Sequence, residues 1–263
     1  MIEQQRDDAW LTVWLDRPDT RNALSTEMVD ALAKCLDEAR ADETLRGLTI
    51  RGRGGVFCAG GDLKMFSDVF QGDADRSRVE HMSRQAGELL TVLASMPVPV
   101  IAAVDGAAMA GGLGMACAAD FVVSTRDARF ALTETRLGIP PAQIAPYVVR
   151  RTGMAAARRI MLAATRFDAA HAQALGIVDQ LADDAGGLDR MVADLRNELL
   201  QCAPNATRVT KGLLDRLDAP EGDEFIDVAA RAFADCLLSD EGREGIASFI
   251  GKRAPAWVPG GTD

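Results

Sequence analysis

The chain has 263 residues, of which 48% are hydrophobic and 26% charged, and its formal net charge is −10 at pH 7. This length and composition are typical of a folded chain with a sizeable core and exclude a disordered one. The negative charge argues against a nucleic-acid partner, because phosphate contacts require a basic surface. Gly, Pro or Asp interrupts every apolar run before the roughly 18 residues that a membrane span needs, so no span is expected.

The N-terminus and the cysteines point to a reducing compartment. The first ten residues, MIEQQRDDAW, lack the basic start and apolar core of a secretory signal, so we expect a cytoplasmic protein. His81 and His171 lie apart from other ligand-type residues, which argues against a metal site and against a Ser/His/Asp triad. Singly scattered cysteines predict reduced core residues, and these are Cys35, Cys58, Cys117, Cys202 and Cys236.

The first half of the chain alternates predicted strands with predicted helices. Residues 9–16 alternate in polarity as a strand does, and residues 26–42 repeat apolar positions at helical spacing. The predicted elements that follow are a strand within 45–54, a helix over 79–95, a buried strand within 97–106 and two short strands within 120–132. Repeated strand-to-helix units predict an α/β fold with functional loops at strand ends.

The second half of the chain is predicted to be helical. From about residue 142 the patterns have helical spacing, and residues 176–183 form the one strand-like connector. Ser239 is a candidate N-cap for the last helix. The neighbouring Arg150 and Arg151 are interpreted as a solvated helix face. This helical part could cover the first half or build an oligomer.

Two glycine-rich segments follow apolar strands. One is GGVFCAGGDL, which contains Gly60 and Gly61, and the other is GAAMAGGLGMACAAD, which contains Gly111 and Gly114. An apolar helical pattern follows the second segment, so its glycines are predicted at a helix N-terminus, where backbone N–H groups favour an anion or a developing oxyanion. Tight helix-to-strand packing is the alternative. The presence of two such turns favours oxyanion binding over packing alone, because N–H groups from different loops can hold one carbonyl oxygen.

Four segments carry a resemblance to a known family: DRPDTRNALSTEMVDAL, GGVFCAGGDLK, PVPVIAAVDGAAMAGGLGMACAADFVVSTRDARFALTETRLGIPP and HAQALGIVDQL. In their order and spacing the chain resembles the crotonase, or enoyl-CoA hydratase/isomerase, superfamily. The resemblance implies an α/β fold, a crotonase-like spiral of ββα units with a helical C-terminal trimerisation region. It places the spiral core and acyl-CoA site in residues 1–195 and the oligomerisation region in residues 196–263, and it implies a homotrimer or a dimer of trimers.

The resemblance also implies the site residues. The N–H groups of Gly61 and Gly111 form an oxyanion hole for a thioester enolate. Glu134 is the general acid or base, and its apolar neighbours Leu132 and Leu137 are expected to raise its pKa. The positions implied to bind substrate or CoA are Ala23, Leu24, Cys58, Ala59, Lys64, Gly114, Pro141, Gln143, Phe249 and Lys252, the last two serving an adjacent subunit. CoA is part of the substrate, so no cofactor and no metal are expected.

The number of carboxylates leaves the function open. Gly114 stands where two-glutamate hydratases carry the first of their two glutamates, and Glu134 stands at the place of the other. With glycine at this position and with its run from Pro140 to Tyr147, the chain resembles branched glutaconyl-type hydratases, such as methylglutaconyl-CoA or isohexenylglutaconyl-CoA hydratase. Reversible hydration of a 2-enoyl-CoA is therefore the first hypothesis. The alternatives are an enoyl-CoA double-bond isomerase with Glu134 as the single proton shuttle, and a non-catalytic acyl-CoA-binding paralogue.

Several polar groups near these segments have two interpretations. Asp62 and Asp120 are expected to brace turns rather than to act in catalysis. Gln143 and Tyr147 are either polar contacts to a distal group of the substrate or, for Tyr147, part of a packed helix start. Residues 66–78 either determine substrate length or form a surface loop.

Overall fold

A computed structural model describes residues 1–62, 75–216 and 231–259. It divides into two compact units, one of Met1–Met96 with Val100–Val192 and one of Pro97–Pro99 with Ala193–Asp263, where residues 1–195 and 196–263 were expected. No helix among the described residues is long and apolar enough to cross a membrane.

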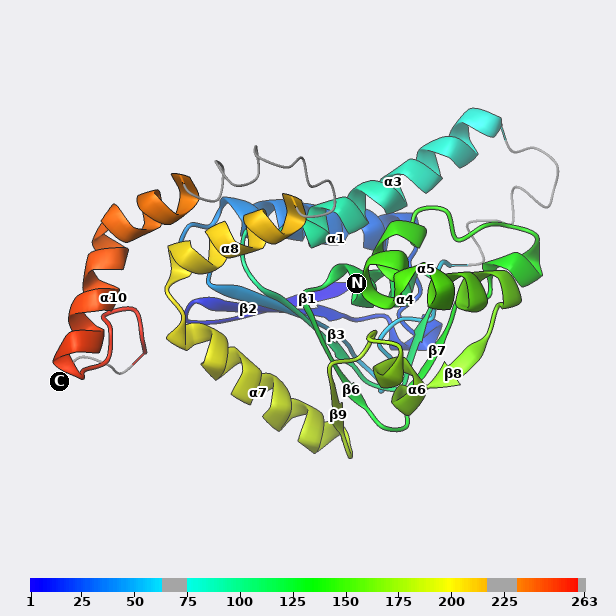
Figure 1. Ribbon diagram of the computed structural model, residues 1–263. Helices are drawn as coiled ribbons and strands as arrows, with labels where there is room; N and C mark the ends of the chain where they lie inside the picture. The colour runs from blue at the N-terminus through cyan, green and yellow to red at the C-terminus, as the bar shows by residue number, and fades with distance from the viewer. Residues whose placement is uncertain (63–74, 217–230, 260–263) are drawn as a thin grey trace. The chain divides into compact units, whose positions relative to one another are not determined.

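A six-stranded sheet forms the centre of the first unit (Figure 1). Its strands, in spatial order, are β1 (Ile2–Asp7), β2 (Trp10–Leu15), β3 (Gly47–Gly52), β4 (Val100–Val104), β6 (Phe121–Thr125) and β9 (Gln180–Ala182). β1 pairs antiparallel with β2, and every other pair is parallel. β4 is buried at every position, as its unbroken apolar run predicts. β1 was not predicted, because it is an edge strand with mostly polar, exposed residues and no apolar alternation.

A second, three-stranded sheet lies beside the glycine-rich segments. Its order is β5 (Ala107–Met109), β7 (Arg129–Ala131) and β8 (Arg166–Asp168), with β5 and β7 parallel and β7 and β8 antiparallel. The expectation of one strand-like connector in the second half was wrong, since β8 precedes β9. A three-residue strand is too short for a period of two to stand out in the sequence.

Helices cover the strands of the first unit, and α1 and α3 lie side by side (Figure 1). The described helices of this unit are η1 (Pro18–Thr20), α1 (Thr26–Ala41), α3 (Arg76–Ala94), α4 (Gly111–Ala118), η3 (Glu134–Leu137), α5 (Ala145–Ala163) and α6 (Ala169–Ala174), and α7 (Ala185–Gln201) runs across the unit boundary. α1 begins at its N-cap Ser25, whose hydroxyl accepts a hydrogen bond from the N–H of Met28. α4 is apolar on every side and contacts α3, α5 and β5, as a central core helix does.

Arg151 of α5 closes the C-terminal end of α4, so its assignment to a solvated helix face was wrong. Its side chain is 11% exposed, and Nη2 donates to the carbonyl oxygens of Ala119 and Asp120, both at 2.9 Å. Nη1 pairs with Asp179 at 3.1 Å. Positive charge at the end of a helix satisfies carbonyl groups that have no partner within the helix.

The second unit is helical where it is described. It contains α8 (Pro204–Arg216), a helical stretch over 231–238 and α10 (Asp240–Gly251). The predicted N-cap Ser239 is confirmed, because its hydroxyl accepts the N–H of Gly242 at 3.0 Å. The prediction that all five cysteines are core residues was wrong for this unit, since Cys202 is exposed and Cys236 is half-buried.

Candidate active site

The loop that precedes Gly61 touches the residue that precedes Gly111. A Cβ atom built on Gly60 would lie 2.8 Å from the Cβ of Ala110, and Gly60 has φ 98°, so both space and backbone conformation require glycine there. Next to this contact, Cys58 and Ala108 form a parallel bridge. Gly61 and Gly111 directly follow the two touching residues. The fold therefore brings the two predicted N–H donors to one place.

The N–H groups of Gly61 and Gly111 donate no hydrogen bond to any residue that the structure describes. Gly111 is the first residue of α4, and its N-cap Ala110 has no capping side chain. The first N–H groups of a helix have no intrahelical acceptor and lie at the positive end of the helix dipole. The glycines are thus at a helix N-terminus, as predicted, and both N–H groups are available to an anionic oxygen.

Ala110 holds a backbone conformation that no sequence pattern indicated. Its φ is 47° and its ψ −118°, which is costly for a residue with a Cβ atom. Its N–H donates to the carbonyl of Ala131 at 2.8 Å, and Met109 pairs with Ala131 in the β5–β7 ladder. The neighbouring sheet thereby fixes the peptide that presents the N–H of Gly111.

Glu134 begins η3 just after β7. Because Met109 in β5 lies opposite Ala131 in β7, Gly111 and Glu134 follow the ends of two adjacent parallel strands. The residue is 8% exposed, and its buried Oε2 has no hydrogen-bond partner in the part of the chain that the structure describes. A buried carboxylate oxygen without a partner is costly, and such a group is suited to binding a ligand or exchanging a proton.

Burial raises the pKa of Glu134 above its ordinary value, while the backbone N–H groups of Glu134 and Thr133 act in the opposite direction. The rise agrees with the direction expected from its sequence neighbours. Leu132 is fully buried as expected, but Leu137 is 62% exposed. A carboxyl with a raised pKa exchanges protons more readily near neutral pH, as a general acid or base must.

No second carboxylate accompanies Glu134 from the described parts of the glycine-rich segments. Asp62 pairs with Arg17 at 3.4 Å, and Asp120 accepts the N–H of Val100 at 2.7 Å, so both brace the backbone as expected. A Cβ atom at Gly114 would lie 3.0 Å from Cγ1 and 3.2 Å from Cγ2 of Ile144. A side chain at position 114, where the resemblance implies the first glutamate of two-glutamate hydratases, would therefore press against the apolar side chain of Ile144, a contact that sequence patterns did not indicate.

The predicted CoA positions at the start of the chain build the loops of the site. The N–H of Leu24 donates to the carbonyl of Gly60 at 2.8 Å, and the carbonyl of Leu24 accepts the N–H of Asp62 at 2.9 Å. The side chains of Ala23, Leu24 and Cys58 are buried.

The thiol of Cys58 lies beneath this loop. It accepts the N–H of Gly60 at 3.4 Å, and burial raises the pKa of the thiol to about 12. Ala59 is half-buried, and Lys64 lies outside the described residues. CoA contacts by these residues stay a prediction.

The residues proposed to contact the acyl group lie at the start of α5. Gln143 donates from Nε2 to the hydroxyl of Ser83 at 3.2 Å, and the hydroxyl of Tyr147 lies 3.2 Å from that of Thr91, so both side chains are tied to α3. Pro141 is buried, and its carbonyl accepts the first N–H of α5. These contacts favour the packed helix start for Tyr147.

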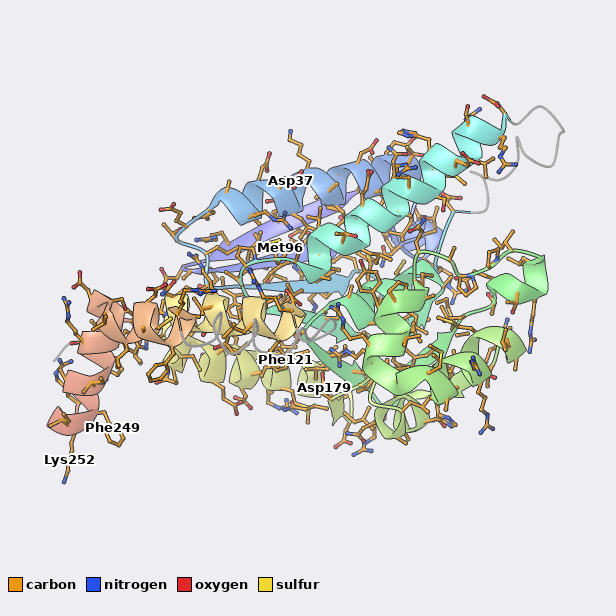
Figure 2. The ribbon with its side chains drawn as sticks, turned by 45° about the horizontal axis from the view of Figure 1, so that its top comes forward. Asp37, Met96, Phe121, Asp179, Phe249 and Lys252 are labelled. Carbon is orange, nitrogen blue, oxygen red and sulfur yellow. The ribbon has the colours of Figure 1, made fainter. Side chains whose placement is uncertain are left out.

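Phe249 and Lys252 lie in the second unit. Figure 2 shows them at the C-terminal end of α10, where Lys252 ends the helix with φ 52°. The side chain of Phe249 is 86% exposed. Their contact with the CoA of an adjacent subunit stays a prediction.

Comparison with known proteins decides the family. Residues 5–259 match the family model described as enoyl-CoA hydratase/isomerase. The chain belongs to the enoyl-CoA hydratase/isomerase family. This assignment confirms the resemblance to the crotonase superfamily and the α/β fold that it implied, and it makes the chain a member of an enzyme family.

Relatives of this enoyl-CoA hydratase/isomerase chain extend over nearly its full length. Pseudomonas aeruginosa AtuE is 40% identical with a TM-score of 0.94, over 98% of this chain and 99% of that one. An enoyl-CoA hydratase/isomerase from Marinobacter aquaeolei is 37% identical with a TM-score of 0.93, over 98% of each chain. The mitochondrial methylglutaconyl-CoA hydratase of Mus musculus is 30% identical over 92% of this chain and 77% of that protein.

Proposed function

We propose that the chain is a hydro-lyase that reversibly adds water to the double bond of a branched, glutaconyl-type 2-enoyl-CoA, with Glu134 as its acid and base. The observation that carries the proposal is the buried Oε2 of Glu134, which has no hydrogen-bond partner among the described residues. Glu134 follows the end of β7, and Gly111 follows the end of the adjacent strand β5. We expect a thioester whose oxygen is bound by the N–H groups of Gly61 and Gly111 to place its double bond near this carboxyl, because Gly111 and Glu134 follow adjacent strand ends.

The reaction balances with one carboxylate. The carboxylate of Glu134 takes a proton from a water molecule as the water oxygen bonds to C3 of the substrate. The electron pair of the double bond moves toward the thioester, and the N–H groups of Gly61 and Gly111 stabilise the resulting enolate. Protonated Glu134 then gives its proton to C2, which restores the carboxylate. The product carries OH on C3 and a new hydrogen on C2.

Two observations support a branched, glutaconyl-type substrate. One relative is named methylglutaconyl-CoA hydratase. In addition, Gly114 of α4 carries no carboxylate and faces the apolar side chain of Ile144, which agrees with the glycine at this position in the branched glutaconyl-type hydratases that the chain resembles.

A double-bond isomerase is the second candidate, because one carboxylate suffices to move a proton. Glu134 would take a proton from C2 of a 3-enoyl-CoA and return it to C4, and the same two N–H groups would stabilise the enolate between the steps. The family description covers both reactions. The two candidates differ in whether solvent oxygen enters the product.

A panel of acyl-CoA substrates in ¹⁸O-labelled water separates these functions. The panel contains crotonyl-CoA, 3-methylglutaconyl-CoA and a 3-enoyl-CoA. We expect the highest kcat/KM for 3-methylglutaconyl-CoA, with label in the product. Unlabelled product with a shifted double bond would support the isomerase instead.

The role of Glu134 is tested by Glu134→Gln, which keeps the shape of the side chain and removes its acid. We expect kcat to fall about 10²- to 10⁴-fold without loss of folding. Glu38→Gln on the exposed side of α1 is the matched control and is expected to retain full activity. A folded Glu134→Gln protein with full turnover would remove Glu134 from the mechanism.

The proposal includes a cytoplasmic homotrimer, or a dimer of trimers, that needs no cofactor beyond the CoA of its substrate. Large apolar side chains in the described parts of the second unit support an oligomer, since they are exposed in the single chain. They include Phe233, Leu238, Phe249 and Ile250. In such an assembly Phe249 and Lys252 would contact the CoA of an adjacent subunit.

A further inference from the structure

Ile144 occupies the space into which a side chain at position 114 would project. Gly114 is buried in α4, one helical turn after Gly111. A Cβ atom there would meet Cγ1 and Cγ2 of Ile144 at 3.0 and 3.2 Å, whereas the Cβ of Ile144 would lie at an ordinary distance of 3.5 Å. The conflict therefore comes from the two branches of the isoleucine and not from its backbone.

Ile144 is held where it causes this conflict. Its side chain is 8% exposed, and branching at Cβ restricts its rotamers. Gln143, directly before it, bonds to Ser83 of α3, and Tyr147, three residues after it, bonds to Thr91 of α3. The carbonyl of Ile144 also accepts the N–H of Val148 at 3.2 Å. These bonds hold the backbone of Ile144 at the start of α5.

We propose that Ile144 is a specificity-determining residue, which keeps side chains out of position 114 and so prevents α4 from supplying a second carboxylate beside Glu134. A glutamate at 114 would meet the apolar branches of Ile144 in a buried place, where a charged group without a partner is costly. The selection of a one-carboxylate reaction rests on the proposed function. The steric coupling of residues 114 and 144 does not rest on it.

Thermal unfolding of four proteins tests the coupling without any assay of activity. With Ile144 present, Gly114→Ala is expected to lower Tm by about 2–6 °C, because the added methyl overpacks the core. In the Ile144→Ala background the same substitution is expected to raise Tm by about 2 °C, because alanine is a better helix former than glycine. The sign of the effect therefore reverses.

Val148→Ala is the matched control, since it removes another buried β-branched side chain of α5. In that background Gly114→Ala is expected to lower Tm as it does in the parent protein. If Gly114→Ala lowers Tm equally in the parent protein and in the Ile144→Ala background, the proposal is overturned.

The consequence for reactivity is tested with Gly114→Glu and crotonyl-CoA. Gly114→Glu alone is expected to lower Tm and kcat. The double variant Gly114→Glu/Ile144→Ala is expected to hydrate crotonyl-CoA at least about tenfold faster than Ile144→Ala, because the second carboxylate can then share the proton transfers. A folded double variant no faster than Ile144→Ala would overturn this part.

Failure of the proposed function gives a different result. In that case the parent protein hydrates no 2-enoyl-CoA, while the Tm reversal at Gly114 is still measured.

Discussion

Glu134 is expected to lower the free energy of unfolding at neutral pH, because its charged form is buried with one oxygen unpaired among the described residues. A group whose pKa is raised by folding stabilises the protein fully below its unfolded pKa, and this contribution is lost as the pH rises through the folded pKa. The cost of Glu134 is therefore absent in acid and complete above the folded pKa.

Glu134→Gln is expected to raise Tm at pH 8 by about 2–4 °C, which corresponds to about 1 kcal/mol in a chain of this size. The advantage over the parent protein shrinks toward pH 4.5, the ordinary pKa of the carboxyl. Thermal unfolding of both proteins between pH 4.5 and pH 8 measures the difference. A difference independent of pH would show that the charge of Glu134 is not its source.

The N–H of Gly111 can be removed without removing a side chain. Gly111→Pro deletes the donor at the first position of α4, and it also disfavours the ψ of −118° at Ala110, so both effects remove this N–H from the site. Gly111→Ala is the control, since it keeps the N–H and its Cβ meets only the flexible end of Leu24. We expect kcat/KM of the proline variant to be about 10²- to 10³-fold below that of the alanine variant. Equal activity in two folded variants would contradict an oxyanion role for this N–H.

Two glycines in helices are expected to respond in opposite directions to alanine. Gly153 interrupts α5 with φ 74° and ψ 161°, a conformation that only glycine adopts readily, whereas Gly212 in α8 has no positive φ, and neither has a described atom within 4 Å of a new Cβ. Gly153→Ala is expected to cost about 1–3 kcal/mol, and Gly212→Ala to add up to about 1 kcal/mol. Urea unfolding of both variants measures these changes. A neutral Gly153→Ala would mean that the break in α5 relaxes freely.

Elements with a long or regular pattern could be predicted from the sequence. α1 repeats its apolar positions at helical spacing, and β4 is an unbroken apolar run. β1 and β8 could not, because an exposed edge strand and a three-residue strand have no periodic signature. Arg151 was misassigned for a related reason, since its partners are the carbonyl groups at the end of α4, about thirty residues earlier in the chain.

The exposed apolar side chains of the second unit predict that the whole molecule is an oligomer. Phe249→Glu places a charge where Phe249 is 86% exposed, so the single chain tolerates it while an apolar interface does not. We expect the parent protein to have the mass of a trimer or hexamer by light scattering, and the variant to dissociate. A monomeric parent protein would exclude the oligomer.

Part of the candidate site could be predicted from the sequence. The positions of Gly61, Gly111 and Glu134 followed from motif order, and the structure brings their strand ends together. The backbone of Ala110 and the contact between Gly114 and Ile144 could not be predicted, because they depend on how segments distant in the chain pack. Motifs indicate which residues are present, but the packing decides what space is left between them.

Chemical labelling of the buried thiol of Cys58 can report how often the loop that contains Gly60 and Gly61 opens. A thiol with a pKa of about 12 and no exposed surface reacts with an alkylating reagent only when the surrounding strand ends separate, whereas the exposed Cys202 reacts directly. The slow modification of Cys58 therefore measures how often this loop opens. A bound acyl-CoA that bridges Gly61 and Gly111 should slow that modification and leave the rate at Cys202 unchanged.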